Sequence, residues 1–327
     1  MAYQHIEVTP LSGACGAVVS GIDLSEDLDE QRLGEVRRAF HENLVIFFRD
    51  QDLTEDEHKA FGRRFGSLNV HPRYVPIEGH PEIIPIRKDP EHTDNIGGVW
   101  HQDLTHLEEP PLGSILYALE VPSTGGDTMF ANQYLAYEAL SGGMKDLLNG
   151  MIAVHDNVIQ SPKISADKNT TRTSKLRENI DEEDEPEMEH PVVVTHPDTG
   201  RKALYVNSIR TRRFKEMTAE ESKPLLDYLV EHSYKPEFTC RFRWEKGSVA
   251  FWDNRCLMHY ALNDYPGQRR YMNRVTVNGG RPVAWPTPRR SAANAQSRRP
   301  SPLRAMTVYH LNILSTPNRG SQRSLNC

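Results

Sequence analysis

The sequence predicts a β-rich α+β fold, a sandwich or jelly roll built from short strands with helices packed outside. Short runs rich in β-branched and aromatic residues recur along the 327 residues, and Gly, Pro, Asn and Asp mark turns between them. Only four longer stretches carry apolar residues at helical spacing. No run of 18 apolar residues occurs, so we expect no membrane-spanning helix.

The beginning of the chain predicts an ordinary α+β scaffold. Apolar and polar residues alternate over 5–24, which indicates short strands, and 44–48 is an apolar run typical of a buried strand. Between them, 25–43 predicts an amphipathic helix from four apolar residues at helical spacing: Leu28, Leu33, Val36 and Phe40. Thr54 and Glu57 form a capping box, so a second helix begins there.

A proline- and glycine-rich segment at 69–98 predicts a long loop that one strand at 82–87 interrupts. The loop leads directly into Val99–Thr105, where the first candidate site residues stand. A long polar loop in that position is where a lid over an active site is expected.

The centre of the chain continues the alternation of strands and helices. Strands are predicted at 112–119, 129–131 and 151–155, and a helix is predicted at 133–148. The highly charged segment 163–189 predicts a mobile, solvated insertion.

The C-terminal half adds a hairpin, a helix and closely spaced strands. Pro197 to Gly200 supply the hairpin turn, and Thr218 with Glu221 forms a second capping box that opens a helix to about His232. The strands predicted after it are 238–244, 248–252, 259–262 and 270–277.

Composition and charge divide the chain into two parts. Residues 1–285 predict a single domain, whereas 286–327 predicts a disordered tail rich in Pro, Ser, Asn and Arg. The net charge is −6, and the tail holds seven arginines but no acidic residue or lysine, which leaves −13 on the domain. An acidic domain argues against nucleic acid as the main partner.

The four cysteines indicate a reducing compartment. Cys15, Cys240, Cys256 and Cys327 are scattered and form no CxxC pair. The first residues also lack the basic and apolar regions of a secretory signal. We therefore expect reduced thiols and a cytoplasmic location.

The strongest indication of chemistry is the pair His101-x-Asp103, together with a second candidate ligand, His259, far downstream. On a strand, residues i and i+2 point to the same face, so an imidazole nitrogen and a carboxylate oxygen can converge on one ion. A second histidine from a distant strand would complete two histidines and one carboxylate. That set is the facial triad of non-haem Fe(II) oxygenases, which leaves coordination positions open. The alternative is chance, because isolated H-x-D pairs are common.

Two arginines, Arg270 and Arg274, would share one face of a strand and could enter one cavity. A buried guanidinium cannot lose its proton and is costly to desolvate, so it needs an anionic partner. A metal site with such arginines implies anionic ligands, unless both residues lie at the surface in ion pairs.

Six motifs occur in order along the chain, and together they carry a resemblance. They are W-H-x-D-x-T (100–105), P-S-T-G-G-D-T (122–128), A-Y-E-A-L-S (136–141), H-P-x-T-G-x-x-x-L-Y-V-N (196–207), W-D-N-R (252–255) and Q-R-R-x-M-x-R (268–274). From about residue 5 to 284 the chain resembles the taurine dioxygenase/2,4-dichlorophenoxyacetate dioxygenase family of Fe(II)- and 2-oxoglutarate-dependent oxygenases. The resemblance implies a double-stranded β-helix, a distorted jelly roll, and a family in which dimers and tetramers are common.

Carried over residue by residue, the resemblance implies a metal site and a co-substrate site. His101, Asp103 and His259 would be the Fe(II) ligands. Arg270 would hold the distal carboxylate of 2-oxoglutarate, helped by the hydroxyl of Thr128.

The substrate implied is a small organic anion. Arg274 would lie near its anionic group or near a carboxylate of 2-oxoglutarate, and His71 and Tyr74 match lid positions that contact the sulfonate in taurine enzymes. The chain departs from taurine enzymes at Gly97, where they carry asparagine, and at Arg210, where they carry an aromatic residue. These departures argue against taurine, and Arg210 favours a substrate with a second anionic group.

The predicted reaction is hydroxylation of a sulfonate, an alkyl sulfate or a phenoxyalkanoic acid with 2-oxoglutarate and O2. Where the hydroxylated carbon bears a leaving group, the product collapses to an aldehyde or keto acid. A zinc hydrolase could use the same two-His-one-carboxylate set, but it would have no use for the anion clamp of Thr128 and Arg270. A non-enzymatic jelly-roll binding protein would tolerate loss of His259.

Overall fold

The computed structural model describes residues 2–71, 74–157 and 187–284, which belong to one compact unit, Met1–Trp285. The predicted tail 286–327 lies outside the described residues, and so does most of the predicted insertion 163–189. The end predicted for that insertion is wrong, because strand β8 already begins at Met188.

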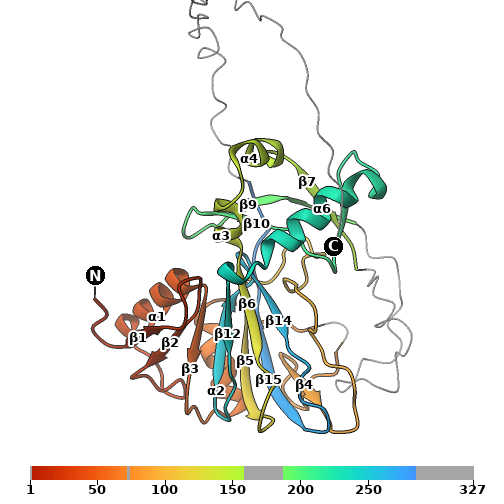
Figure 1. Ribbon diagram of the computed structural model, residues 1–327. Helices are drawn as coiled ribbons and strands as arrows, with labels where there is room; N and C mark the ends of the chain where they lie inside the picture. The colour runs from red at the N-terminus through yellow and green to blue at the C-terminus, as the bar shows by residue number, and fades with distance from the viewer. Residues whose placement is uncertain (1, 72–73, 158–186, 285–327) are drawn as a thin grey trace, which may run out of the picture. The chain divides into compact units, whose positions relative to one another are not determined.

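A large sheet forms the base of the unit, with its strands in the order β1-β2-β3-β13-β5-β15-β4 (Figure 1). The strands are β1 (Glu7–Pro10), β2 (Ala17–Ser20), β3 (Val45–Phe48), β4 (Ile83–Lys88), β5 (Gly113–Glu120), β13 (Val249–Asp253) and β15 (Arg270–Val277). Every neighbouring pair is antiparallel except β2 with β3. Strands β13 and β5 are buried almost throughout, as expected of central strands with packing on both faces.

A smaller sheet in the order β12-β6-β14 packs against the large one. Its strands are β12 (Thr239–Phe242), β6 (Thr128–Asn132) and β14 (Leu257–Ala261). The rings of Phe47 on β3 and Phe242 on β12 stack with centroids 3.8 Å apart, and Phe130 on β6 lies 6.0 Å from Trp252 on β13. Apolar side chains of both sheets thus form one shared core, and the predicted β-rich α+β class is confirmed.

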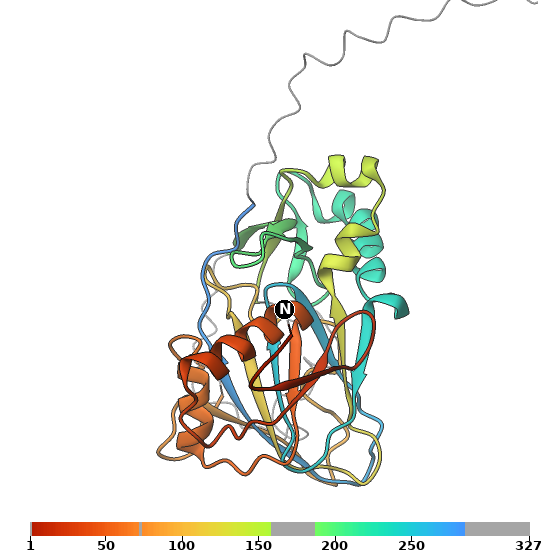
Figure 2. The ribbon, with the colours of Figure 1, turned by 90° about the vertical axis from the view of Figure 1, so that its left-hand side faces the viewer.

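Two helices, α1 (Glu30–Asn43) and α2 (Glu55–Arg63), cover the outer face of the large sheet (Figure 2). Phe40 of α1 stacks on Phe251 of β13 with ring centroids 4.1 Å apart. Helix α1 begins later than predicted, because Asp29 is its N-cap and accepts from two backbone N–H groups. The capping box of Thr54 and Glu57 is confirmed with both of its hydrogen bonds.

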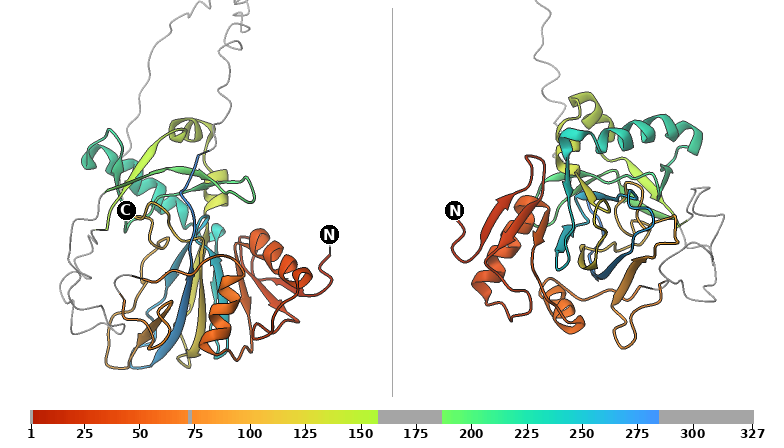
Figure 3. Two further views of the ribbon diagram at one scale, coloured as in Figure 1. Left: turned by 180° about the vertical axis from the view of Figure 1, so that it is seen from behind. Right: turned by 60° about the horizontal axis from the view of Figure 1, so that its bottom comes forward.

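A third group of elements lies beyond the end of the two sheets (Figure 3). It contains β7 (Ile152–His155), β8 (Met188–Pro191) and β11 (Thr211–Phe214) in one sheet, the hairpin β9 (Val193–Thr195) and β10 (Lys202–Leu204), and the helices α3 (Gln133–Glu138), α4 (Gly142–Leu148), α6 (Ala219–Ser233) and η1 (Pro236–Phe238). The capping box of Thr218 and Glu221 opens α6 as predicted. With 15 residues, α6 is the longest described helix, and none in the described ranges is long and apolar enough to cross a membrane.

The single helix predicted over 133–148 is wrong, since α3 and α4 are separate. Ser141 caps α4, and its hydroxyl accepts from the backbone N–H of Met144. Two glycines, Gly142 and Gly143, follow the cap, and glycine destabilises the interior of a helix. The apolar spacing continued across this break, so periodicity alone could not reveal it.

Candidate active site

The structure brings His101, Asp103 and His259 together, but not by the strand geometry that the sequence predicted. His101 forms an isolated antiparallel bridge with His259, with N···O distances of 3.1 and 2.9 Å. Asp103 follows in a turn, where Leu104 has a φ of 51°. The Oδ1 atom of Asp103 lies 3.5 Å from Nε2 of His101 and 3.8 Å from Nε2 of His259. One ligand atom from each residue therefore falls within 4.8 Å of the others.

The protonation states suit a divalent metal ion. Nδ1 of His101 lies 2.8 Å from the Val99 carbonyl and donates to it, so Nε2 keeps its lone pair toward Asp103. Burial, together with His101, lowers the pKa of His259 to about 3, which keeps that imidazole neutral near pH 7. Burial also acts to raise the pKa of Asp103, but the neighbouring His259 and Arg274 hold that pKa well below its usual range. Two imidazoles and one carboxylate are a donor set that fits Fe(II).

Two residues that the sequence analysis did not assign hold Asp103 in place. The Asn254 side chain accepts from the Asp103 backbone N–H at 2.6 Å and donates to the Asp103 carbonyl at 2.9 Å. Ser114 of β5 donates to Oδ2 of Asp103 at 3.0 Å. Asn254 stood inside the quoted motif W-D-N-R without a role, whereas no motif pointed to Ser114.

Arg270 is buried with no anionic group attached to its guanidinium. Its side chain leaves Nε and Nη2 without a hydrogen-bond partner among the described residues, and desolvation lowers its pKa. Trp244 connects it to Thr128, because the guanidinium carbon lies 5.7 Å from the Trp244 ring and the indole N–H donates to the Thr128 hydroxyl at 2.9 Å. The Thr128 hydroxyl proton stays available for a further acceptor. A carboxylate would satisfy both residues, so this corner fits one end of 2-oxoglutarate.

Trp244 belongs to the hydrophobic core that the two sheets share, and it also lies beside the corner of Arg270 and Thr128. Its ring is buried at 4% exposure, between the two residues predicted to clamp an anion. His196 pairs with Asp253 at 2.9 Å, and Cys256 is a buried free thiol.

Arg274 lies beside the triad rather than beside Trp244. Its Nη1 atom is 3.7 Å from Oδ1 of Asp103, and its Nε is buried without a hydrogen-bond partner in the described part of the chain. A second anion could therefore bind next to the metal ligands, as the sequence predicted for either the substrate or the co-substrate.

The remaining predicted substrate residues lie in two places. The rings of His71 and Tyr74 meet edge to face with centroids 4.8 Å apart, and His71 is buried. Arg210 donates to the carbonyl and the side-chain oxygen of Asn157, at 2.9 and 2.6 Å. Its backbone N–H donates to Asn207, whose side chain reaches Thr105 at 3.1 Å. Arg210 is thus linked to the loop of Asp103 through Asn207 and Thr105.

Gly97 forms part of the wall beside His101. A Cβ at this position would lie 3.3 Å from Cε1 and 3.9 Å from Nε2 of His101, and 3.7 Å from the methyl group of Ala261. A side chain at 97 would therefore project toward the Cε1–Nε2 edge of the His101 ring. Glycine leaves that space open, and Ala261 makes its far side apolar.

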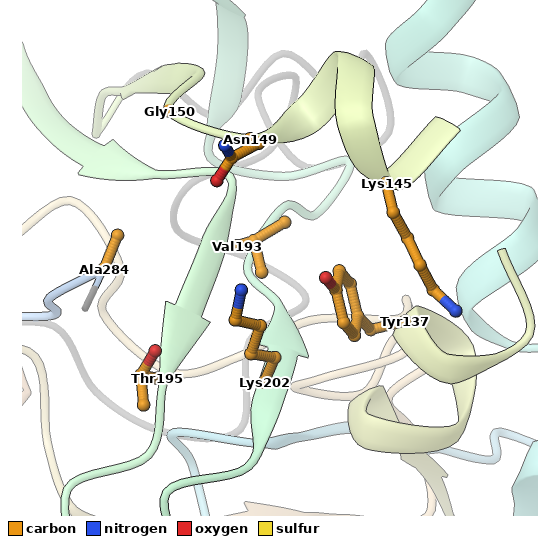
Figure 4. A pocket seen from close by; sticks show the side chains of 8 residues that line it. All are labelled: Tyr137, Lys145, Asn149, Gly150, Val193, Thr195, Lys202 and Ala284. Atoms are coloured by element: carbon orange, nitrogen blue, oxygen red, sulfur yellow. The ribbon is translucent and has the colours of Figure 1, made fainter. Parts of the chain in front are cut away.

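Two other hollows are separate from the triad. A cavity of about 20 Å³ lies between α3, β9 and β10 and is lined by Tyr137, Val193 and Lys202 (Figure 4). It is large enough for about one water molecule. An open apolar groove of about 250 Å³ follows Trp100 and Tyr260. Because successive strand residues point to opposite faces, Tyr260 lies on the opposite face of β14 from His259.

Comparison with known proteins gives one consistent answer. Residues 7–276 match the family model described as taurine catabolism dioxygenase TauD, TfdA family. The chain is 35% identical over 277 residues to an alkylsulfatase of Acinetobacter baylyi, covering 84% of this chain and 86% of that protein. It is 34% identical over 280 residues to an alpha-ketoglutarate-dependent sulfate ester dioxygenase of Pseudomonas putida, covering 85% and 91%. The crystal structure of a taurine dioxygenase from Burkholderia xenovorans superposes with a TM-score of 0.71 at 36% identity, covering 86% of this chain and 93% of that one.

Proposed function

The chain belongs to the taurine catabolism dioxygenase TauD/TfdA family, and we propose that its substrate is an alkyl sulfate ester or an alkanesulfonate. Membership makes the protein a 2-oxoglutarate-dependent dioxygenase that uses Fe(II) and O2. The observation that carries the proposal is the convergence of His101, Asp103 and His259 next to Arg274, with the buried Arg270 on the same strand, β15.

In this proposal the side chains divide the work of binding. His101, Asp103 and His259 hold Fe(II), and Arg270 with Thr128 binds the distal carboxylate of 2-oxoglutarate. Together with O2 these groups supply an oxidant that can hydroxylate an unactivated C–H bond. Burial of the protein groups excludes water, which strengthens each charge-assisted contact.

The substrate contacts form the second half of the proposal. Arg274 binds the anionic head group, which places the neighbouring carbon next to Asp103 and the two histidines. His71 and Tyr74 close over the substrate as part of the lid at 69–98, and Arg210 lies at the margin of the pocket. Hydroxylation of the carbon that bears a sulfate ester gives an unstable adduct, which releases sulfate and an aldehyde.

An alkyl chain fits this chamber better than the aminoethyl group of taurine. The opening at Gly97 lies between the His101 ring and the Ala261 methyl group, and once Nε2 of His101 holds the metal neither offers a hydrogen-bond acceptor for an amine. Burying an unpaired ammonium is costly, whereas burying methylene groups is favourable by about 0.8 kcal/mol each. The names of the alkylsulfatase and the sulfate ester dioxygenase agree with this choice.

Three further features belong to the proposal. The two packed sheets close into a double-stranded β-helix, and residues 1–285 act as one catalytic domain. The location is cytoplasmic, which is supported by the scattered cysteines of the sequence, since they form no CxxC pair. A dimer or tetramer is the expected assembly, and nucleic acid is not an expected partner. The zinc-hydrolase alternative has no support among the family relatives.

The test starts without oxygen. The purified protein receives Fe(II) and 2-oxoglutarate, and the visible metal-to-ligand charge-transfer band is recorded before and after adding linear alkyl sulfates, alkanesulfonates, taurine and phenoxyalkanoic acids. We expect a band that shifts with a medium-length alkyl sulfate, and release of succinate and sulfate in equal amounts once air is admitted. His101→Ala is the control, and it should abolish the band.

The outcomes separate the reaction class from the substrate class. No band in a protein that retains Fe(II) would contradict the assigned 2-oxoglutarate site. A band that shifts with taurine or a phenoxyalkanoic acid but with no alkyl sulfate or alkanesulfonate would overturn the substrate assignment alone.

A further inference from the structure

The two carboxylate oxygens of Asp103 have different surroundings. Oδ1 faces the centre of the triad, 3.5 Å from His101 Nε2 and 3.8 Å from His259 Nε2, with Arg274 Nη1 at 3.7 Å. Oδ2 instead accepts a hydrogen bond from the Ser114 hydroxyl at 3.0 Å. One oxygen is therefore directed at the metal position and the other is occupied by the protein.

Ser114 is firmly placed to make this contact. It is fully buried in β5, where its backbone pairs with Trp252 of β13 on one side and Thr276 of β15 on the other. The next polar atom is the Thr276 hydroxyl at 3.4 Å, which is longer than the Asp103 contact. The hydroxyl of Ser114 thus has Asp103 as its nearer partner, on a strand that two neighbours hold.

The backbone of Asp103 is fixed independently of its side chain. Asn254 binds both the N–H and the carbonyl of Asp103, at 2.6 and 2.9 Å. With the backbone held, rotation of the carboxylate about its side-chain bonds is the main remaining freedom. The bond from Ser114 opposes that rotation, because turning Oδ2 toward the metal would leave a buried hydroxyl without its partner.

We propose that Ser114 is a positioning residue that keeps Asp103 a one-oxygen metal ligand. This inference rests on the proposed Fe(II) site. Two imidazoles and one carboxylate oxygen leave three positions of an octahedral ion open. 2-Oxoglutarate would take two of them, which would leave the last for dioxygen. If Oδ2 of Asp103 also bound the metal ion, it would fill this last position, and dioxygen could no longer bind.

The first test counts open positions with Mn(II), which needs neither 2-oxoglutarate nor turnover. The relaxation of water protons by the Mn(II)-loaded protein is measured for the wild type and for Ser114→Ala. We expect the relaxivity per bound Mn(II) to fall by about one third in the variant, because one of three exchangeable waters is displaced. Unchanged relaxivity at full Mn(II) loading would overturn the proposal.

The second test uses nitric oxide as a stand-in for dioxygen on the anaerobic Fe(II) and 2-oxoglutarate complex. In Ser114→Ala we expect the charge-transfer band to persist and the affinity for nitric oxide to fall at least about tenfold, which is about 1.4 kcal/mol. A purely structural role would weaken the band and nitric oxide binding together, and that result would contradict the proposal.

Two further variants separate the hydrogen bond from simple packing. Ser114→Cys keeps the volume but donates weakly, so it should behave as Ser114→Ala does. Thr276→Val removes the neighbouring hydroxyl that contacts Ser114 and not Asp103, so it should behave as the wild type. A wild-type-like Ser114→Cys would assign the effect to the lost volume and overturn the proposal. Absence of the 2-oxoglutarate band in the wild type would instead count against the proposed function, since the Mn(II) test does not depend on it.

Discussion

At the scale of single residues, the site depends on polar groups that are buried before any ligand arrives. Arg270 is 5% exposed, and its Nε and Nη2 have no hydrogen-bond partner among the described residues, while Arg274 lies beside Asp103. Leaving a charge buried without a partner is costly, so these residues mark places where a ligand completes the protein.

Arg270→Ala should lose the co-substrate. A buried ion pair between an arginine and a carboxylate is one of the strong hydrogen-bonded contacts. Without the Arg270 guanidinium, we expect the Kd for 2-oxoglutarate to rise at least about 100-fold. The measurement is an anaerobic titration of the charge-transfer band. Arg243→Ala, at an exposed position of the same region, is the matched control and should leave the Kd unchanged. An Arg270→Ala protein with wild-type affinity would remove Arg270 from the co-substrate site.

Gly97→Asn should narrow the substrate range. The new side chain would enter the space beside Cε1 of His101, so we expect KM for longer alkyl sulfates to rise about tenfold while the shortest ones change little. Gly79→Asn is the matched control, because Gly79 has a similar φ of 79° and a Cβ there meets nothing within 4 Å. Equal effects of both variants on every chain length would show that Gly97 does not shape the pocket.

At the scale of elements, the triad depends on connections more than on strands. Asp103 lies in the turn between the His101 bridge and β5, and Asn254 lies in the connection from β13 to β14. The side chain of Asn254 binds the turn at both backbone groups of Asp103. Backbone groups in these connections have no neighbouring strand to pair with. The amide side chain of Asn254 therefore supplies the hydrogen bonds that a strand would otherwise supply.

Asn254→Ala should loosen this turn and weaken metal binding. Removing a residue that orients a ligand typically costs about 10- to 100-fold in metal affinity, and we expect a loss in that range. An anaerobic titration with Mn(II), followed by its electron paramagnetic resonance signal, measures it. Asn278→Ala removes an exposed asparagine that bonds to Ser67 and Asn69, and this variant should bind Mn(II) as the wild type does. Unchanged Mn(II) affinity in Asn254→Ala would mean that the clamp serves stability alone.

At the scale of the whole molecule, burial ties stability to pH. Burial lowers the pKa of His58 to about 4 and that of His155 to about 3. In the unfolded chain an ordinary histidine has a pKa of about 6.5. Between these values the unfolded state takes up protons that the folded state does not, so stability decreases as pH falls from about 6.5 toward 4.

His58→Asn should flatten this pH dependence. His58 donates from Nε2 to the Ile115 carbonyl at 3.2 Å. The side-chain NH2 group of asparagine can donate the same hydrogen bond. Between pH 7.5 and pH 5 we expect the variant to lose about 2 kcal/mol less unfolding free energy than the wild type. Urea unfolding at both pH values measures this, and the difference between them cancels any packing cost of the substitution. Parallel losses in both proteins would contradict a buried neutral His58.

The sequence by itself determined the features that depend on neighbouring residues or on short sequence motifs. The two capping boxes at Thr54 and Thr218 were predictable, because each involves residues only three apart. Most strands were predictable from short β-branched runs, and the six ordered motifs identified the family. His101 lies in the first of those motifs and His259 follows the W-D-N-R motif by four residues, so both could be named as ligand candidates from the sequence.

Only the tertiary structure decided how these residues meet. Sequence reasoning placed His101 and Asp103 on one strand, whereas a bridge and a turn bring them together. Ser114 and Trp244 acquire their roles from atoms 11 and 116 residues away in the chain, at Asp103 and Thr128. Sheet packing sets such contacts, and no local pattern encodes the distance between two strands. The physical reason is that secondary-structure propensity and helix capping act over a few residues. A site, in contrast, consists of groups that become neighbours only when the core has folded.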